Sequence, residues 1–177
     1  MIERARKFVA EKHLKPSSEQ RYGGKPYTFH TDMVASNATR YSYLLSEDKR
    51  ENAIVSAHGH DLLEDTDTTQ KDLIKIFNEV VADTIFRVTD ERGFSKKEML
   101  FKTLPKIWQS ELATFVKLCD RMANGRNSKT EATKKGRKMF KRYKKQYPIF
   151  RYALKVEEFK HFQPMWDELD EIFEWNL

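Results

Sequence analysis

The sequence has few of the residues that interrupt or cross-link a chain. Its one cysteine, Cys119, excludes an internal disulfide and fits a reducing cytoplasm. Only six glycines and five prolines punctuate the 177 residues, and no repeat or low-complexity linker is present. No apolar run is long enough to cross a bilayer, and the N-terminal "MIERARKFVAEKHL" lacks the apolar core of a signal peptide. We therefore expect one cytoplasmic domain over residues 1–177, without a membrane partner.

Alternation of apolar and polar residues, which is typical of half-buried strands, is also scarce, whereas helical periodicity is common. The fold class that this pattern predicts is all-α, a globule of about eight to ten helices. The expected helical segments, in chain order, are 2–14, 27–45, 53–64, a helix capped by Thr68 or Thr69, 78–90, a helix with a Ser95–Glu98 capping box, 110–124, and two or three C-terminal helices bounded near Pro148 and Pro164.

Charge is plentiful but uneven. The net charge is +6, with basic residues concentrated over Lys129–Arg151 and an acidic segment, "WDELDEIFEWNL", at the C-terminus. A basic balance suits a polyanionic partner, either nucleic acid or a phosphorylated small molecule. Taken alone, however, the basic run is more simply interpreted as a solvated helix face.

The segment richest in chemistry is "HGHDLLEDTDTT", from His58 to Thr69. His60 lies four residues before Glu64, and Asp61 lies four residues before Asp65. If the segment is helical, each pair therefore stacks on one side of the helix, and the two pairs are adjacent. An imidazole nitrogen and carboxylate oxygens together suit a divalent ion such as Mn²⁺, Fe²⁺ or Zn²⁺. The pattern predicts part of a metal site.

Two further ligands are expected from elsewhere in the chain. His30 lies in "PYTFH", and Asp120 lies among apolar residues in "KLCDRMAN". Taken singly, His30 would be an ordinary hydrogen-bonded histidine, and Asp120 an aspartate paired with Arg121 or a lysine. Considered together with His60 and Asp61, they favour a metal site, because a buried carboxylate without a partner is costly.

The order His30, His60–Asp61, Asp120 resembles the H…HD…D pattern of the HD-domain metal-dependent phosphohydrolases. Four segments resemble, more narrowly, the hydrolase domain of RelA/SpoT-type enzymes: "RYGGKPYTFH", "HDLLEDTDTT", "VTDERGFSKKE" and "VKLCDRMANGRN". They follow the same order from Arg21 to Asn127, whereas the C-terminal helices fit only loosely. The length is similar to that of the stand-alone small alarmone hydrolases, including the metazoan SpoT homologue.

The resemblance implies a function and a set of roles. The family removes the 3′-pyrophosphate of guanosine tetra- and pentaphosphate, (p)ppGpp, usually with Mn²⁺. Its ligands correspond to His30, His60, Asp61 and Asp120, and its two catalytic carboxylates to Glu64 and Asp65. Its substrate contacts correspond to Arg21 (against the base), Lys96 (phosphate) and Asn124 (nucleoside), with Arg137 and Tyr143 as further candidates in the basic run, where no motif fixes the register.

Several departures from the family pattern leave the substrate open. His58 and Gly59 stand where relatives carry apolar residues. We interpret His58 either as structural or as a residue that supports the metal ligands without binding the metal, and we expect Gly59 to open space beside the metal. Alternative substrates are the 2′-phosphate of NADPH and nucleoside monophosphates. An alternative of another class is a nucleic-acid-binding protein whose metal site is vestigial, and the four intact ligands argue against it. The sequence assigns no oligomeric state.

Overall fold

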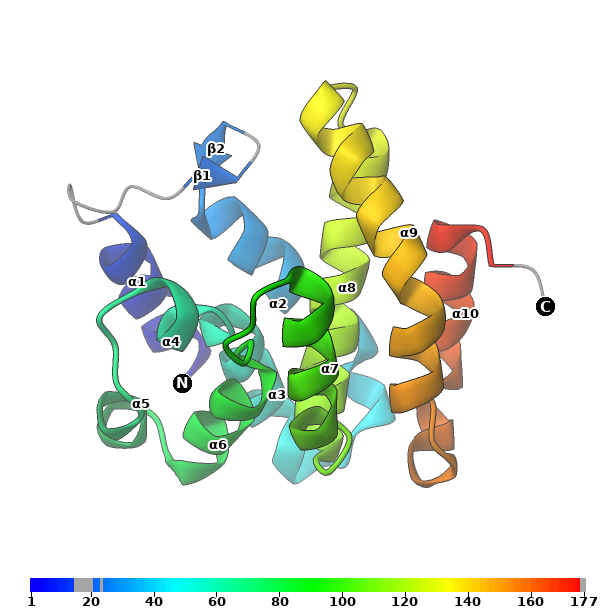
Figure 1. Cartoon of the computed structure of the whole chain (residues 1–177). Coiled ribbons are helices and arrows are strands. Elements are labelled where there is room, and N and C mark those ends of the chain that lie inside the picture. The colour runs from blue at the N-terminus through cyan, green and yellow to red at the C-terminus, as the bar shows by residue number, and fades with distance from the viewer. Residues whose placement is uncertain (15–20, 23, 176–177) are drawn as a thin grey trace.

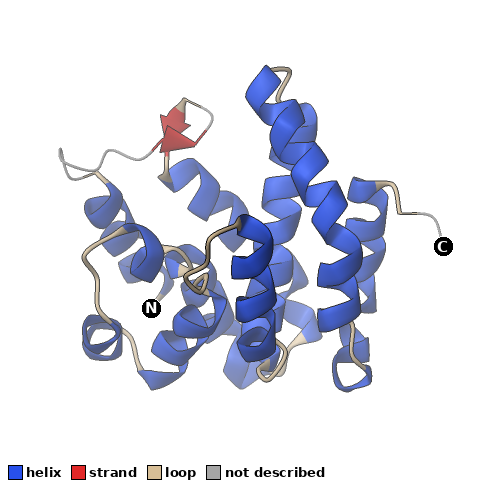
Figure 2. Cartoon of the chain, in the orientation of Figure 1, coloured by secondary structure: helices blue, strands red, loops and turns tan. Residues whose placement is uncertain are grey.

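The structure, a computed structural model, describes residues 1–14, 21–22 and 24–175, and the side chain of Arg21 is outside the described part. Its elements, in chain order, are α1 (Ile2–His13), β1 (Arg21–Tyr22), β2 (Lys25–Pro26), α2 (Thr28–Tyr41), the 3₁₀ turn η1 (Ser42–Leu44), α3 (Glu47–Gly59), α4 (Leu62–Asp65), α5 (Gln70–Ile76), α6 (Glu79–Val88), α7 (Lys96–Ile107), α8 (Glu111–Thr130), α9 (Lys134–Leu154), η2 (Glu157–Phe162) and α10 (Gln163–Phe173). The all-α prediction is confirmed, since β1 and β2 form only a short antiparallel pair (Figure 2).

Helix α8 runs through the middle of the fold and packs against α2, α3, α6, α9 and α10 (Figure 1). Its sequence explains this position, because apolar residues form a broad face of the helix: Leu112, Phe115, Val116, Leu118 and Met122 are all buried. A second, smaller apolar cluster joins α1, α3, α4, α5 and α6 through residues such as Val9, Val55 and Ile85. The candidate site lies over α8, where α2, α3 and α9 meet it.

Local signals place several helix starts correctly. The side chain of Thr69 accepts a hydrogen bond from the backbone amide of Asp72, and the carboxylate of Asp72 accepts one from the backbone amide of Thr69, so the expected cap is a full capping box. At α7 the side chain of Ser95 accepts from the Glu98 amide at 3.1 Å. Glu98, however, bonds to the amide of Phe94 rather than to that of Ser95, so the predicted box is only half formed.

Two predicted boundaries are wrong. The helix expected over 53–64 begins earlier, at Glu47, and ends at Gly59, after which His60 and Asp61 form a turn before α4. Pro148 does not bound a helix but lies inside α9. The helix continues through Pro148 because Tyr147, Phe150 and Leu154 are fully buried on its inner face, and this burial outweighs the one backbone hydrogen bond that a proline removes. None of the helices in the described part is both long and apolar enough to span a membrane.

Candidate metal centre

The turn between α3 and α4 presents His60 and Asp61 side by side. His60 has helical backbone angles, but Asp61 (φ −100°, ψ 1°) leaves the helix and begins α4. The Asp61 carbonyl accepts from the amides of Glu64 and Asp65, which fixes the turn. The two adjacent residues therefore reach the same point, an arrangement that an uninterrupted helix would not give.

Four side chains from three parts of the chain converge at that point. The Nε2 atoms of His30 and His60 are 3.2 Å apart, and His30 Nε2 lies 3.4 Å from Asp120 Oδ1. Asp61 Oδ2 lies 2.9 Å from His60 Nε2 and 3.7 Å from His30 Nε2. Ligands held about 2.0–2.2 Å from one ion are separated by about 3.0–3.5 Å. His30, His60 and Asp120 are all buried, and their ligand atoms lie within 4.8 Å of one another, close enough to hold one metal ion. His60 Nε2 is 3.8 Å from Asp120 Oδ1, and Asp61 lies beside the three as the fourth predicted ligand.

The hydrogen bonding of His60 suits a metal ligand. Its Nδ1 lies 2.9 Å from the Ala57 carbonyl oxygen, which can only accept, so Nδ1 carries the hydrogen. In the neutral ring the lone pair is then on Nε2, the atom that faces the other ligands. Burial lowers the pKa of His60, but the carboxylates of Asp61 and Asp120 raise it to about 9 overall. A cation at this point, whether a proton or a metal, is therefore favoured by the surroundings.

Each carboxylate of the cluster is held by a neighbour. The hydroxyl of Tyr27 donates to Asp61 Oδ2. The side-chain amide of Asn124 donates to Asp120 Oδ1, and Lys117 Nζ lies 3.6 Å from Asp120 Oδ2. Burial would raise the pKa of Asp120, but the bond to His30 and the charge of Lys117 hold it well below its usual range, so the carboxylate is ionised.

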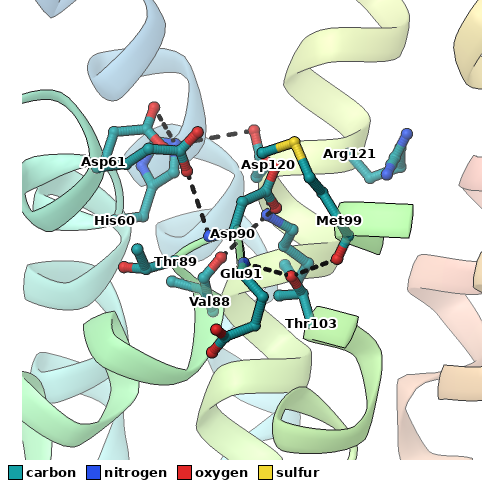
Figure 3. Close-up of polar contacts among 12 residues, drawn as sticks. His60, Asp61, Val88, Thr89, Asp90, Glu91, Met99, Thr103, Asp120 and Arg121 are labelled. Carbon is teal, nitrogen blue, oxygen red and sulfur yellow. Dashed lines mark hydrogen bonds and ion pairs between the residues drawn. The ribbon is translucent and has the colours of Figure 1, made fainter. Parts of the chain in front are cut away.

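The two predicted catalytic carboxylates follow the ligands at the end of α4 and line the same cavity. Glu64 Oε2 accepts from the amide of Asp90, in the loop between α6 and α7. Burial, and then the charges of Asp90 and Asp61, raise the pKa of Glu64. Figure 3 shows this loop below the cluster, with the Glu91 amide donating to Thr103 and Thr103 donating to the Met99 carbonyl. The anchored loop fixes Asp90 beside Glu64.

A polar cavity of about 220 Å³ opens over the cluster. Of the expected substrate contacts, the structure brings Lys96, Asn124 and Tyr143 to its wall. The side-chain oxygen of Asn124 accepts hydrogen bonds from the hydroxyls of Tyr22 (3.0 Å) and Tyr143 (3.2 Å). Asn124 therefore orients both of these rings in addition to Asp120. Arg137 is exposed, donates to the Ala132 carbonyl and is not part of the wall; the arginine of α9 that lines the cavity is Arg142. Arg21 was expected to act through its side chain, which lies outside the described residues.

The structure adds wall residues that sequence reasoning did not single out. They are Tyr22, Tyr27, Asp90, Leu100, Lys117, Arg121, Arg142 and Gln146. Helical spacing could have indicated two of them, since Lys117 and Arg121 lie three residues before and one after Asp120, on the side of α8 that also carries Asn124. The others reach the site only through the tertiary fold.

The unusual pair before the HD residues lies away from the cavity. His58 is buried with Nδ1 3.8 Å from Asp32 Oδ1, and burial lowers its pKa, so it is a neutral structural residue, as expected. The expectation for Gly59 is wrong. A Cβ atom there would meet Ile85 Cδ1 at 2.9 Å and Leu62 Cδ1 at 3.1 Å, so the missing side chain allows α3 to pack on α6 and does not widen the metal site.

Comparison with known proteins gives a likeness of fold. No protein-family model and no curated protein matches the chain. Among solved structures, the chain is similar to a metazoan ortholog of SpoT that hydrolyses ppGpp and plays a role in starvation responses. The TM-score is 0.69 over 98% of this chain and 93% of that one, with 22% sequence identity. The two chains share a fold along nearly their whole lengths.

Proposed function

We propose that the protein is a metal-dependent phosphohydrolase that acts on (p)ppGpp, releasing the 3′-pyrophosphate. The observation that carries the proposal is the convergence of His30, His60, Asp61 and Asp120 beneath a cavity lined by both carboxylates and cations. The fold shared with a ppGpp hydrolase supports the same substrate. We further propose that residues 1–177 act as one hydrolase domain in the cytoplasm.

The four ligands would hold a divalent metal, for which we propose Mn²⁺. A bound divalent ion lowers the pKa of water and neutralises charge on a phosphoryl oxygen. The donor set of two imidazoles and two carboxylates fits such a borderline ion. The protein's own contribution is to hold both aspartates ionised and the Nε2 atoms of both histidines directed inward.

The proposed role of Glu64 and Asp65 is to orient the attacking water and remove its proton. A carboxylate is a better base when its pKa is raised toward the working pH, and burial with Asp90 has this effect on Glu64. The water oxygen bonds to the phosphorus attached to the 3′-oxygen, and the bond from that phosphorus to the 3′-oxygen breaks. Pyrophosphate leaves, and the freed 3′-oxygen takes up a proton to become the 3′-hydroxyl of the product nucleotide. The proposed role of Lys96 and Lys117, which both line the cavity, is to offset the negative charge that develops on the phosphoryl oxygens.

The test is a product analysis with purified protein, Mn²⁺ and three kinds of substrate: ppGpp, NADPH and a panel of nucleoside monophosphates. We expect pyrophosphate and GDP from ppGpp. Phosphate from NADPH alone, or from a monophosphate alone, would replace the proposed substrate but keep the hydrolase. Salt-sensitive binding of DNA without turnover of any nucleotide would favour a nucleic-acid-binding protein instead.

A further inference from the structure

Among the described residues, four cations line the cavity, and they fall into two kinds. Lys117 lies between two carboxylates, 3.8 Å from Asp90 and 3.6 Å from Asp120, and Lys96 lies 3.9 Å from Asp90. The polar contacts of Arg121 and Arg142 with other described residues are instead to Gln146 and to Tyr143, and neither is to a carboxylate. Among the described residues, each lysine thus lies near a carboxylate, and neither arginine has one at that distance.

Arg121 is buried in an unusual setting for an unpaired charge. Its side chain is only 5% exposed and lies against two rings, 5.0 Å from the centre of Tyr143 and 4.6 Å from that of Phe150. One nitrogen donates to Gln146 Oε1 at 3.4 Å, and its Nε has no partner among the described residues. Because burying a charged donor without an acceptor is costly, a cavity residue of this kind indicates a bound anion.

Arg142 brings a second positive charge to the same ring. Its guanidinium is also 5.0 Å from the centre of Tyr143, and it donates to the Tyr143 hydroxyl at 3.3 Å. Two like charges on one aromatic ring repel each other unless an anion lies between or beside them. In the view of Figure 3, Asp120 lies between His60 and Arg121.

We propose that Arg121 and Arg142 form a second anion subsite, which holds a phosphate group of the substrate other than the one that reacts. Guanidinium groups suit phosphate oxygens because their N–H donors form paired hydrogen bonds. The subsite defines a substrate class: nucleotides with two separate phosphate-bearing positions are preferred, and nucleoside monophosphates are poor substrates. The substrate class rests on the proposed function, whereas the binding of an anion by the two arginines does not.

The first test does not depend on turnover. Isothermal titration of the metal-free protein with inorganic pyrophosphate measures the subsite directly. Arg121→Gln and Arg142→Gln should each weaken binding about 10- to 100-fold, the effect of losing a charged hydrogen bond. Lys145→Gln is the matched control, since Lys145 is exposed on α9 and its replacement removes the same charge from outside the cavity. Equal weakening by Lys145→Gln, or no weakening by either arginine variant, overturns the subsite.

The second test compares ppGpp with guanosine 3′-diphosphate, which lacks the second phosphate-bearing position. Arg142 is half-buried, so Arg142→Gln is expected to fold and keeps the test valid if the variant at the buried Arg121 misfolds. Both variants should raise KM for ppGpp about 10- to 100-fold with little change in kcat, and raise KM for guanosine 3′-diphosphate less than about threefold. Equal losses on both substrates contradict the subsite. If the wild type turns over neither nucleotide but still binds pyrophosphate through the arginines, the proposed function fails and the subsite stands.

Discussion

The Tyr27 hydroxyl offers a sharp test of how the fold supports the metal centre. Tyr27 donates to Asp61 Oδ2, and its ring stacks on His13 with the centroids 4.6 Å apart. Burial, and then the charge of Asp61, raise the pKa of Tyr27, so the phenol remains a donor at any physiological pH. Tyr27→Phe removes this one hydrogen bond and preserves the ring.

The expected effect has two parts. A hydrogen bond to a charged group contributes about 1.5–3 kcal/mol, so the free energy of unfolding of the metal-free protein should fall by about 2 kcal/mol. Loss of a residue that orients a metal ligand costs about 10- to 100-fold in metal affinity or activity. Titration calorimetry with Mn²⁺ and urea unfolding measure the two effects separately.

Tyr147→Phe is the matched control. Tyr147 is fully buried, and its hydroxyl donates to Asp170 Oδ1 at 2.6 Å, between α9 and α10 and away from the cavity wall. This variant should lose similar stability and bind Mn²⁺ like the wild type. A Tyr27→Phe protein that binds Mn²⁺ within about twofold of the wild type, or equal weakening of binding in both variants, refutes this role of the hydroxyl.

Three further predictions concern charge, packing and the metal. The pKa of Glu64 is raised above its ordinary 4.5, partly by Asp90, so kcat should fall as the pH drops toward that raised pKa. Asp90→Asn should move this acidic limb of the pH profile to lower pH, with the half-exposed Asp83→Asn as the control. A limb that does not move argues against Glu64 as the base. Gly59→Ala should lower the free energy of unfolding in urea by about 1 kcal/mol, since crowding against Ile85 Cδ1 exceeds the gain in helix propensity, and kcat/KM should stay within about twofold. Adding Ile85→Val should reduce the crowding. A changed KM at unchanged stability would contradict this packing. Removal of the metal with a chelator should abolish turnover but leave the chain folded, because its two apolar clusters do not depend on the metal. Metal added at 100 times its Kd should raise the free energy of unfolding by about 2.7 kcal/mol, which thermal melting measures. A chelated chain that shows no cooperative unfolding transition would contradict this prediction.

The sequence predicted the features that depend on residue type and short spacing. The all-α class followed from helical periodicity, and the Thr69 cap followed from a side chain and an amide three residues apart. The four ligands were predicted because a histidine, an HD pair and an aspartate within an apolar helix supply, when taken together, the donor atoms of a divalent metal site. None of these features requires knowledge of how the helices pack.

What the sequence did not predict depends on packing. His60 and Asp61 lie in a turn because both must reach one point, whereas the local pattern favours an unbroken helix. Arg142, rather than Arg137, lines the cavity because Tyr147 and Phe150 fix which face of α9 is turned inward. The preceding segment, residues 134–146, is mostly basic, so its few apolar residues do not show that register. Asp90 reaches Glu64 only because its loop is anchored on α7 through Thr103.

The most direct test of the central claim is the metal content of two variants, measured beside turnover of ppGpp. Asp61→Ala should lose both bound metal and pyrophosphate release, because Asp61 lies within the cluster of ligands. Glu64→Ala should retain the metal at the wild-type stoichiometry and lose most turnover, because Glu64 acts on water. Equal loss of metal in both variants, or full turnover in Glu64→Ala, would contradict the division between ligands and base.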